Sequence, residues 1–157
     1  MLGGDHDRGG FRSGAPELDR YIRELATQDV RRRTAAVFVA VDESAVVGYY
    51  TLSASAIELI ELPETIARRL PRYPLIPATL LGRLAVDERW QGRGLGEHLL
   101  LDALFRSLRS EIASYAVVVD ARDDRAIRFY ERYGFTGLGI GMRLFLPMST
   151  VARLERT

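Results

Sequence analysis

The chain contains no cysteine, no lysine and no asparagine among its 157 residues. Without cysteine it can form no disulfide, no thiolate metal site and no cysteine nucleophile. Its two histidines, His6 and His98, stand far apart in the sequence, so we expect no metal site. We find neither an apolar run long enough to cross a bilayer nor a secretory leader. The sequence therefore predicts a cytoplasmic protein with no membrane partner.

The charge of the chain is nearly balanced, but its cations are of one kind. All 22 basic residues are arginine, against 21 acidic residues, which gives a net charge of +1. The planar guanidinium of arginine suits phosphate better than the ammonium of lysine. A coding bias would also remove lysine and asparagine together, and a net charge near zero does not indicate a nucleic-acid partner. Composition alone therefore gives no reason to predict an anionic ligand.

The length suits one domain with one core. Residues 1–10 are rich in Gly and Asp, which predicts a flexible N-terminus followed by a domain at residues 11–157. Apolar periodicity predicts helices at residues 16–30, 58–70, 94–109 and 123–133, and strands at 34–41, 45–54, 80–86, 115–121, 135–138 and 142–147. The prolines of residues 71–77 predict a stiff loop that excludes helix and central strand. This order is typical of an α/β (α+β) fold with a mixed central sheet flanked by helices.

Three glycines, Gly92, Gly94 and Gly96, stand between the strand at 80–86 and the following helix. Unpaired amides in a first helical turn, with the positive end of the helix dipole, can hold a phosphate. A P-loop is excluded because it requires a lysine, and the dinucleotide fingerprint is excluded because Glu97 stands where its third glycine is needed. The glycines predict either an anion site of another kind or only a tight turn.

The pattern Gln91-x-x-Gly94-x-Gly96 resembles the acetyl-CoA pyrophosphate loop of the GCN5-related N-acetyltransferases, the GNAT superfamily. Residues 128–135 resemble a second signature of that superfamily, Phe-Tyr-x-x-x-Gly-Phe. The resemblance implies a single GNAT-type domain with acetyl-CoA as cofactor, Tyr130 as the general acid for the departing thiolate, and a backbone N–H near Val86 as oxyanion donor. It further implies the cofactor-binding residues Leu84, Ala85, Val86, Gln91, Gly92, Arg93, Gly94, Leu95, Gly96, Asp123 and Phe129. The alternative is that Phe129 and Tyr130 only pack a helix.

The groups available favour direct attack by an amine. No Ser-His-Asp set is indicated and cysteine is absent, which argues against a covalent acyl-enzyme. No general base is evident. A lysine amine with a pKa of about 10.4 costs roughly 4 to 5 kcal/mol to deprotonate at pH 7, whereas an α-amine with a pKa of about 7.7 costs about 1 kcal/mol. The lack of a base therefore favours an α-amine acceptor.

Five segments, residues 11–21, 47–53, 69–74, 81–87 and 145–148, resemble the TacT-type GNAT toxins of type II toxin–antitoxin modules. This resemblance implies acetylation of the α-amine of aminoacyl-tRNA, which blocks translation, together with a ribbon-helix-helix antitoxin and a homodimer. It implies that tRNA is held by Arg31, Arg32, Arg33, Arg72, Arg83 and Arg93.

Three alternatives stay open. The cluster Arg31 to Arg33 also suits a solvated helix end that complements the dipole. The acceptor could be a small-molecule amine or a protein N-terminus, served by the same cofactor loop. The chain could also be a binding module that keeps the cofactor pocket without catalysis.

Overall fold

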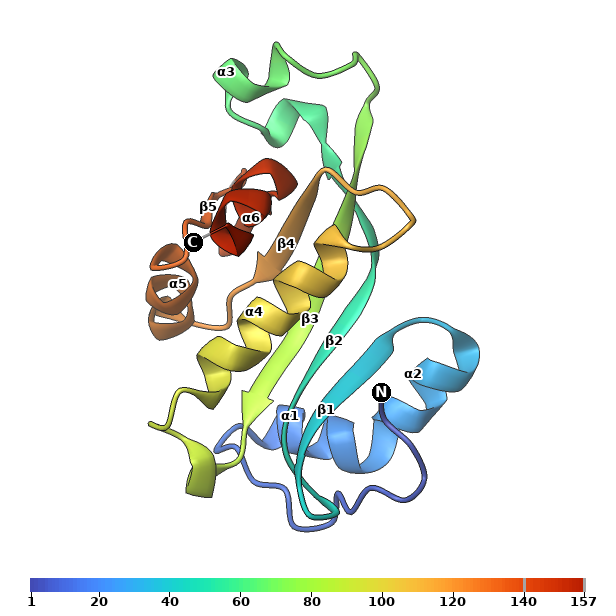
Figure 1. Ribbon diagram of the computed structural model, residues 1–157. Helices are drawn as coiled ribbons and strands as arrows, with labels where there is room; N and C mark the ends of the chain where they lie inside the picture. The colour runs from blue at the N-terminus through green and yellow to red at the C-terminus, as the bar shows by residue number, and fades with distance from the viewer. Residues whose placement is uncertain (140, 157) are drawn as a thin grey trace. The chain divides into compact units, whose positions relative to one another are not determined.

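The computed structural model describes residues 1–139 and 141–156 (Figure 1). Residues 140 and 157, the second being the predicted end of the domain, lie outside them. The strands form one six-stranded sheet in the order β1-β2-β3-β4-β6-β5. Helices occur between the strands along the chain, which confirms the predicted α/β class. The chain divides into two compact units, unit 1 being Met1–Ser53 with Leu81–Ala103 and unit 2 being Ala54–Leu80 with Leu104–Thr157. Three elements contribute to both units: β2 (Ala45–Glu58), β3 (Leu75–Val86) and α4 (Leu95–Leu108).

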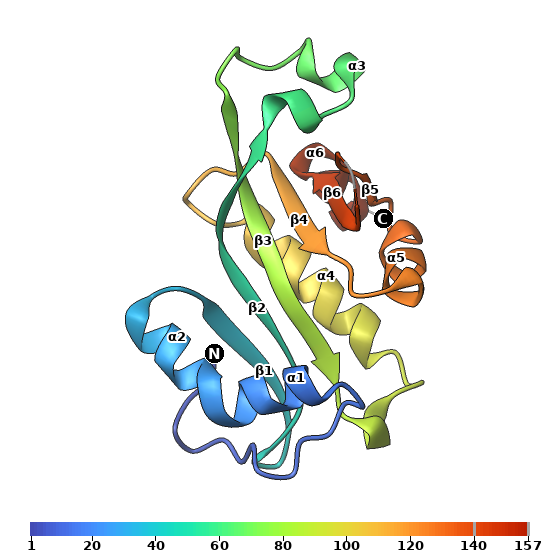
Figure 2. The same cartoon turned by 180° about the vertical axis from the view of Figure 1, so that it is seen from behind.

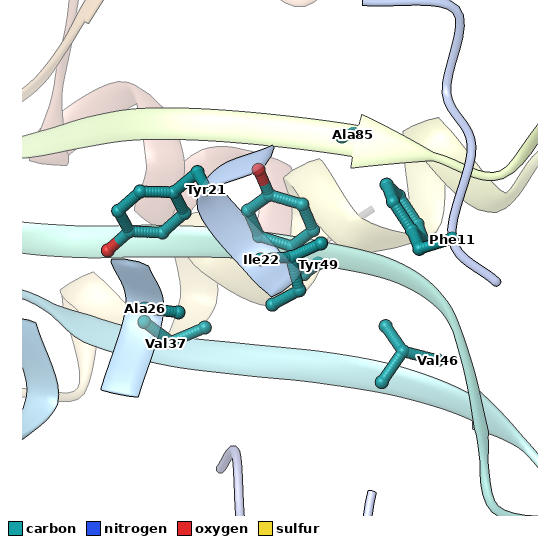
Figure 3. Close-up of a cluster of buried hydrophobic side chains, with 8 residues drawn as sticks. All are labelled: Phe11, Tyr21, Ile22, Ala26, Val37, Val46, Tyr49 and Ala85. Carbon is teal, nitrogen blue, oxygen red and sulfur yellow. The ribbon is translucent and has the colours of Figure 1, made fainter. Parts of the chain in front are cut away.

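Unit 1 begins with one helical stretch of three segments, α1 (Pro16–Arg20), the π-helical η1 (Tyr21–Leu25) and α2 (Ala26–Arg32). It confirms the helix predicted at residues 16–30 and extends it by two residues. The stretch lies beside β1 (Ala36–Asp42), which pairs antiparallel with β2 (Figure 1). Figure 3 shows the core that they share, formed by Phe11, Tyr21, Ile22, Ala26, Val37, Val46, Tyr49 and Ala85.

The first ten residues, for which the sequence predicts flexibility, make backbone contacts with this hairpin. The N–H of Leu2 donates to the carbonyl of Val37 at 2.9 Å. The N–H of Asp7 donates to the carbonyl of Ser44 at 2.7 Å, and the carbonyl of Asp7 accepts from the N–H of Val46 at 2.8 Å. Such bonds use main-chain groups alone, so no pattern of side chains in residues 1–10 could have indicated them.

Unit 2 is built around β4 (Ala116–Asp120), which pairs antiparallel with β6 (Arg143–Pro147). The short β5 (Thr136–Gly137) pairs with β6 in turn. Two helices complete this part, α5 (Asp124–Glu131) and α6 (Met148–Glu155), and α6 contacts β6 (Figure 2). The strands and α5 were predicted, whereas α6 was not. The core of unit 2 consists of Ile57, Leu62, Ile76, Ala78, Ala116, Val118, Leu138 and Phe145.

The connection between β2 and β3 departs from one expectation. It contains η2 (Leu59–Glu61) and α3 (Glu64–Ala67), in place of the longer helical stretch predicted at residues 58–70. The expectation that the prolines exclude a strand is wrong at Pro77, which lies inside β3. Proline lacks only the N–H, and the carbonyl of Pro77 still accepts a hydrogen bond from the N–H of Tyr115 at 2.8 Å.

Two features are absent from residues 1–139 and 141–156. No helix there has the length and apolar character needed to span a bilayer. No group of three or more acidic or histidine side chains there is arranged to hold a metal ion.

Candidate functional site

The glycine loop of unit 1 connects the end of β3 to the start of α4 through η3 (Glu88–Trp90). Gly92 and Gly94 have φ angles of 80° and 84°, which lie in the region that other residues rarely adopt. A Cβ added at either glycine would have no other atom within 4 Å, so space lies open beside the loop. These two glycines are therefore required by the backbone, and none of the described residues fills the space beside them.

The amides of this loop are available to a ligand. Within the part of the chain that the structure describes, no oxygen accepts a hydrogen bond from the six consecutive backbone N–H groups of residues 92–97. They stand at the start of a 14-residue helix, whose dipole adds a partial positive charge at this end. Unpaired N–H groups in an open loop at a helix start form an anion site. The residues present therefore fit a phosphate or diphosphate.

Gln91 holds the loop in place with its side chain. Its Nε2 donates to the carbonyl of Val86 at 2.9 Å and to the carbonyl of Ser13 at 2.8 Å. Glu88 adds a backbone bond, because its N–H donates to the carbonyl of Arg12 at 2.7 Å. The side chain of Gln91, a residue that the resemblance implies as cofactor-binding, is thus engaged with the main chain of the protein.

Asp87 also joins the glycine loop to the segment around residue 12, through a carboxylate that is almost fully buried. It accepts hydrogen bonds from the N–H and Nε of Arg89, both at 3.0 Å, and from the N–H of Arg12 at 3.2 Å. Burial by itself would raise the pKa of Asp87, but these bonds to the charged form outweigh it, and the pKa lies below its usual value. An ionised Asp87 therefore ties residue 12 to the start of the glycine loop.

The three predicted cofactor-binding residues of β3 alternate in direction. Ala85 is buried in the core of unit 1, while Leu84 and Val86 are half-buried on the other face. A Cβ added to Gly96 would lie 3.8 Å from Cγ2 of Val86, so Val86 underlies the first turn of α4. The backbone at the end of β3 is fixed by the N–H of Asp87, which donates to the carbonyl of Val47 at 2.8 Å.

Tyr130, the predicted general acid, belongs to unit 2. It lies on α5, which Asp123 caps by accepting from the N–H of Ala126 at 2.8 Å. The Tyr130 side chain is only 9% exposed, and its ring packs against Phe129 and Phe135 at centroid distances of 5.2 and 5.4 Å. The signature residues Phe129 and Tyr130 therefore do pack together, as the structural alternative required.

The hydroxyl of Tyr130 is nevertheless not used by the fold. It has no hydrogen-bond partner among the described residues. Every fully buried side-chain oxygen and nitrogen in that part of the chain does have a partner. The phenol oxygen must therefore reach the surface although its ring is buried. Burial raises the pKa of Tyr130 to about 12, opposed by the nearby charge of Arg122. The side chain thus offers a phenol that stays protonated across the physiological range.

The six predicted tRNA-binding arginines are distributed unevenly. Arg31, Arg32 and Arg33 are exposed at the end of α2. The guanidinium of Arg93 lies over Trp90, 4.9 Å from the ring centroid, at the glycine loop. Arg72 belongs to unit 2, where it lines an open surface hollow of about 390 Å³ with residues 58–60 and 73–75.

Arg83 differs from these because it is half-buried, with its guanidinium 3.6 Å above the ring centroid of Tyr21. Its charge also acts on Asp29, as does that of Arg32. A hydrogen bond from Tyr21 lowers the pKa of Asp29, and the charges of Arg83 and Arg32 lower it further. The structure therefore brings Arg32 and Arg83 to the same side of unit 1. Tyr21 and Asp29 were not predicted as site residues, since the helical spacing of Tyr21 indicates a core position.

This fold and this glycine loop define a known class of enzyme. Residues 33–137 match the family described as acetyltransferase (GNAT) domain, so the chain belongs to that family. The resemblance drawn from the sequence is thereby confirmed, and so is the enzyme class, an acetyltransferase.

The individual relatives are toxins. The chain is 38% identical over 127 residues to a tRNA-acetylating toxin of Mycobacterium tuberculosis (strain ATCC 25618 / H37Rv), covering 80% of this chain and 75% of the relative. It is similar to AtaT complexed with acetyl-methionyl-tRNAfMet, with 28% identity, a TM-score of 0.90 and coverage of 98% and 94%. A tyrosine-to-phenylalanine mutant of the AtaT toxin, bound to the C-terminus of the antitoxin AtaR and acetyl-CoA, is 25% identical with a TM-score of 0.81 and coverage of 98% and 92%.

Proposed function

We propose that this protein transfers the acetyl group of acetyl-CoA to the α-amino group of aminoacyl-tRNA and thereby blocks translation. The observation that carries the proposal is the row of six unpaired amides at residues 92–97, at the start of α4. The acceptor is supported by two relatives, the tRNA-acetylating toxin and AtaT with its acetylated tRNA. The cofactor is supported by the family and by the AtaT complex with acetyl-CoA.

In this proposal the cofactor supplies the activated acyl group, and the protein supplies its orientation. The amides of the glycine loop bind the diphosphate, because Gly92 and Gly94 leave the backbone open to it. The main chain of Leu84, Ala85 and Val86 receives the acyl arm, and a backbone N–H near Val86 stabilises the carbonyl oxygen as it gains charge. Asp123 and Phe129 of α5 also serve the cofactor.

Tyr130 donates a proton to the leaving group. The amine nitrogen attacks the thioester carbonyl carbon, the carbon–sulfur bond breaks, and the sulfur takes the phenolic proton as it departs. The phenolate then regains a proton from the substituted amine, which must lose one to become an amide. A pKa raised to about 12 ensures that Tyr130 carries its proton at the start of every cycle. An α-amine is already largely neutral near pH 8, so no carboxylate base is needed.

The arginines provide the attraction for RNA. We assign phosphate contacts to Arg31, Arg32, Arg33, Arg72, Arg83 and Arg93, all of which are exposed or half-buried. Because the net charge is only +1, affinity must come from these local groups rather than from the field of the whole protein. We further propose that the protein is a homodimer and is neutralised by a ribbon-helix-helix antitoxin, as the toxin of a type II module. The AtaT complex with the C-terminus of AtaR supports an antitoxin partner.

The acceptor is tested by incubating the full chain with radiolabelled acetyl-CoA and separately charged tRNAs. We expect label on the amino acid of at least one charged tRNA, and none on the same tRNA after deacylation. If calorimetry shows normal acetyl-CoA binding while no charged tRNA is labelled, the acceptor is wrong. Turnover of small amines or of peptides with free N-termini in that case would establish the alternative GNAT activity.

The amide row is tested by changing the loop. Gly94→Ala introduces a side chain at a φ of 84°, so we expect acetyl-CoA affinity to fall by at least about tenfold as the amides are displaced. Gly137→Ala is the matched control, because that glycine has open space around its Cβ position and no positive φ. Equal affinities of the two variants for acetyl-CoA would remove the loop from the cofactor site.

A further inference from the structure

Unit 1 holds a cluster of polar side chains on its helical stretch that the cofactor loop does not use. The hydroxyl of Tyr21 donates to Oδ2 of Asp29 at 2.7 Å, and the hydroxyl of Thr34 donates to Oδ1 of the same carboxylate at 3.0 Å. The guanidinium of Arg83, from β3, lies 3.6 Å above the centre of the Tyr21 ring. Both oxygens of Asp29 are thus occupied by hydroxyl groups, and its carboxylate fixes the phenol rather than forming an ion pair.

The π-helical turn explains how Tyr21 meets Asp29. In a regular α-helix each residue advances by about 100°, so residues eight apart diverge by about 80°. The π turn at Tyr21–Leu25 accommodates one extra residue, so this pair behaves as if it were seven apart, a divergence of about 20°. The two side chains therefore share one face of the helix. Single π turns occur frequently at functional sites.

The Tyr21 ring is also held in place by a second aromatic ring. It is stacked on Tyr49 at a centroid distance of 6.1 Å and an interplanar angle of 21°, and Tyr49 meets Phe11 edge-on at 5.6 Å (Figure 3). The Tyr49 hydroxyl donates to the carbonyl of Leu18 at 2.6 Å, which fixes the second ring. With its ring stacked and its hydroxyl bonded, Tyr21 forms a rigid aromatic platform under Arg83.

Arg83 has no other partner in the residues described. No carboxylate there lies within ion-pair distance of its guanidinium, and none of its N–H groups has a protein acceptor. A guanidinium lying over an aromatic ring keeps its N–H edge accessible, and that edge suits two oxygens of one phosphate. Holding a side chain in this way removes much of the rotamer entropy that an exposed arginine loses on binding.

We propose that Tyr21 and Asp29 are positioning residues which hold Arg83 for a phosphate of the acceptor RNA; this rests on the proposed function. A phosphate is favoured over a protein carboxylate because the cations continue along the surface. Arg32 is near enough to act on the same Asp29, and Arg31 and Arg33 flank it on the helix end. A run of cations beside one fixed guanidinium matches a backbone with a charge on every residue, which RNA has.

Binding of uncharged tRNA, measured by fluorescence anisotropy over a range of salt concentrations without acetyl-CoA, tests this assignment apart from catalysis. Arg83→Gln should weaken binding and reduce the slope of log affinity against log salt by about one. Tyr21→Leu should weaken binding by about tenfold and leave the slope unchanged, because the charge remains while its position is lost. Arg83→Lys should behave like Tyr21→Leu. Arg20→Lys, at an exposed position of the same helical stretch that has no assigned tRNA contact, is the matched control and should bind like the wild type.

A double variant separates positioning from a general loss of structure. If Tyr21 acts through Arg83, Tyr21→Leu should cause no further loss in a chain that already carries Arg83→Gln. The same factor of loss in both backgrounds, or no loss in the wild-type background, overturns the inference. Tyr21→Phe keeps the ring but not the bond to Asp29, and we expect a loss of about threefold with an unchanged salt slope. Acetyl-CoA affinity, measured by calorimetry, should be the same for all these variants.

Two further results have defined meanings. A wild-type chain that binds acetyl-CoA but no tRNA contradicts the proposed function, and the inference fails with it. Normal tRNA binding by Arg83→Gln, combined with weakened binding of a purified antitoxin, would assign Arg83 to a protein partner and overturn the RNA assignment while leaving the acetylation of tRNA intact.

Discussion

The buried tyrosines of the two units differ in what their hydroxyl groups do. In unit 1 the hydroxyl of Tyr49 donates to the carbonyl of Leu18, and that of Tyr21 donates to Asp29. In unit 2 the hydroxyl of Tyr130 has no partner among the described residues. Burial raises the pKa of all three phenols. The raised pKa is therefore common to all three tyrosines, and the unused hydroxyl is what sets Tyr130 apart, as its proposed role as a general acid requires.

The largest expected effect follows from removing the unused hydroxyl. Tyr130→Phe keeps the ring in its contacts with Phe129 and Phe135 and deletes only the proton donor. We expect kcat to fall by about 10² to 10⁴-fold, which is the usual contribution of a positioned acid. Thermal stability and acetyl-CoA affinity should stay as in the wild type, because no protein hydrogen bond is lost. A variant with unchanged kcat would show that Tyr130 belongs with the structural tyrosines.

The second effect is the pH dependence of kcat/KM, which follows from the raised pKa of Tyr130. Tyr130 must be protonated to act, and a pKa of about 12 keeps it so up to the highest pH that the assay tolerates. The acceptor amine must be neutral, and the α-amine has a pKa of about 7.7. We therefore expect kcat/KM to rise about tenfold per unit below pH 7.7 and to stay level from pH 8.5 to 10. A decline with a midpoint below pH 10 would contradict the protonated role of Tyr130.

How far the sequence predicted these features depends on how local they are. The strand, glycine loop and helix at residues 80–108 could be predicted, because each follows from its own periodicity and from glycines that only a turn requires. The helix that Asp123 caps was predicted within residues 123–133 for the same reason. The helix α6 was missed, although Met148, Val151 and Leu154 stand three residues apart, because it directly follows the last strand with no turn residues between them.

The platform under Arg83 could not be predicted from periodicity. A regular helix would place Tyr21 and Asp29 on different faces, and only the π turn brings them together. The contact of Arg83 with Tyr21 joins residues 62 positions apart, from a strand and a helix. The resemblance did predict Arg83 as a tRNA-binding residue, but the side chains that hold it depend on tertiary structure.

A moderate effect is expected from a structural hydroxyl in unit 1. Tyr49→Phe removes the bond of 2.6 Å to the carbonyl of Leu18 and leaves the stacked rings in place. The loss should lower the free energy of unfolding by about 1 kcal/mol. For a chain of this length the midpoint of thermal unfolding should fall by about 2 to 4 °C. The value of kcat should not change; a loss of kcat without a loss of stability would break the distinction between the two classes of tyrosine.

The smallest effect concerns Arg33, whose guanidinium has no hydrogen-bond or ion-pair partner among the described residues and whose backbone is strained. Arg33 ends α2 with a φ of 60°, a conformation at which glycine is the usual residue. Arg33→Gly should relieve that strain and raise the free energy of unfolding by about 0.5 to 1 kcal/mol, measured by urea denaturation. If the side chain is retained for RNA, the same variant should bind tRNA more weakly, with a salt slope reduced by about one. Arg33→Lys, which keeps both the strain and the charge, is the control and should change neither quantity. A gain in stability with unaltered tRNA binding would mean that the Arg33 side chain is not retained for RNA.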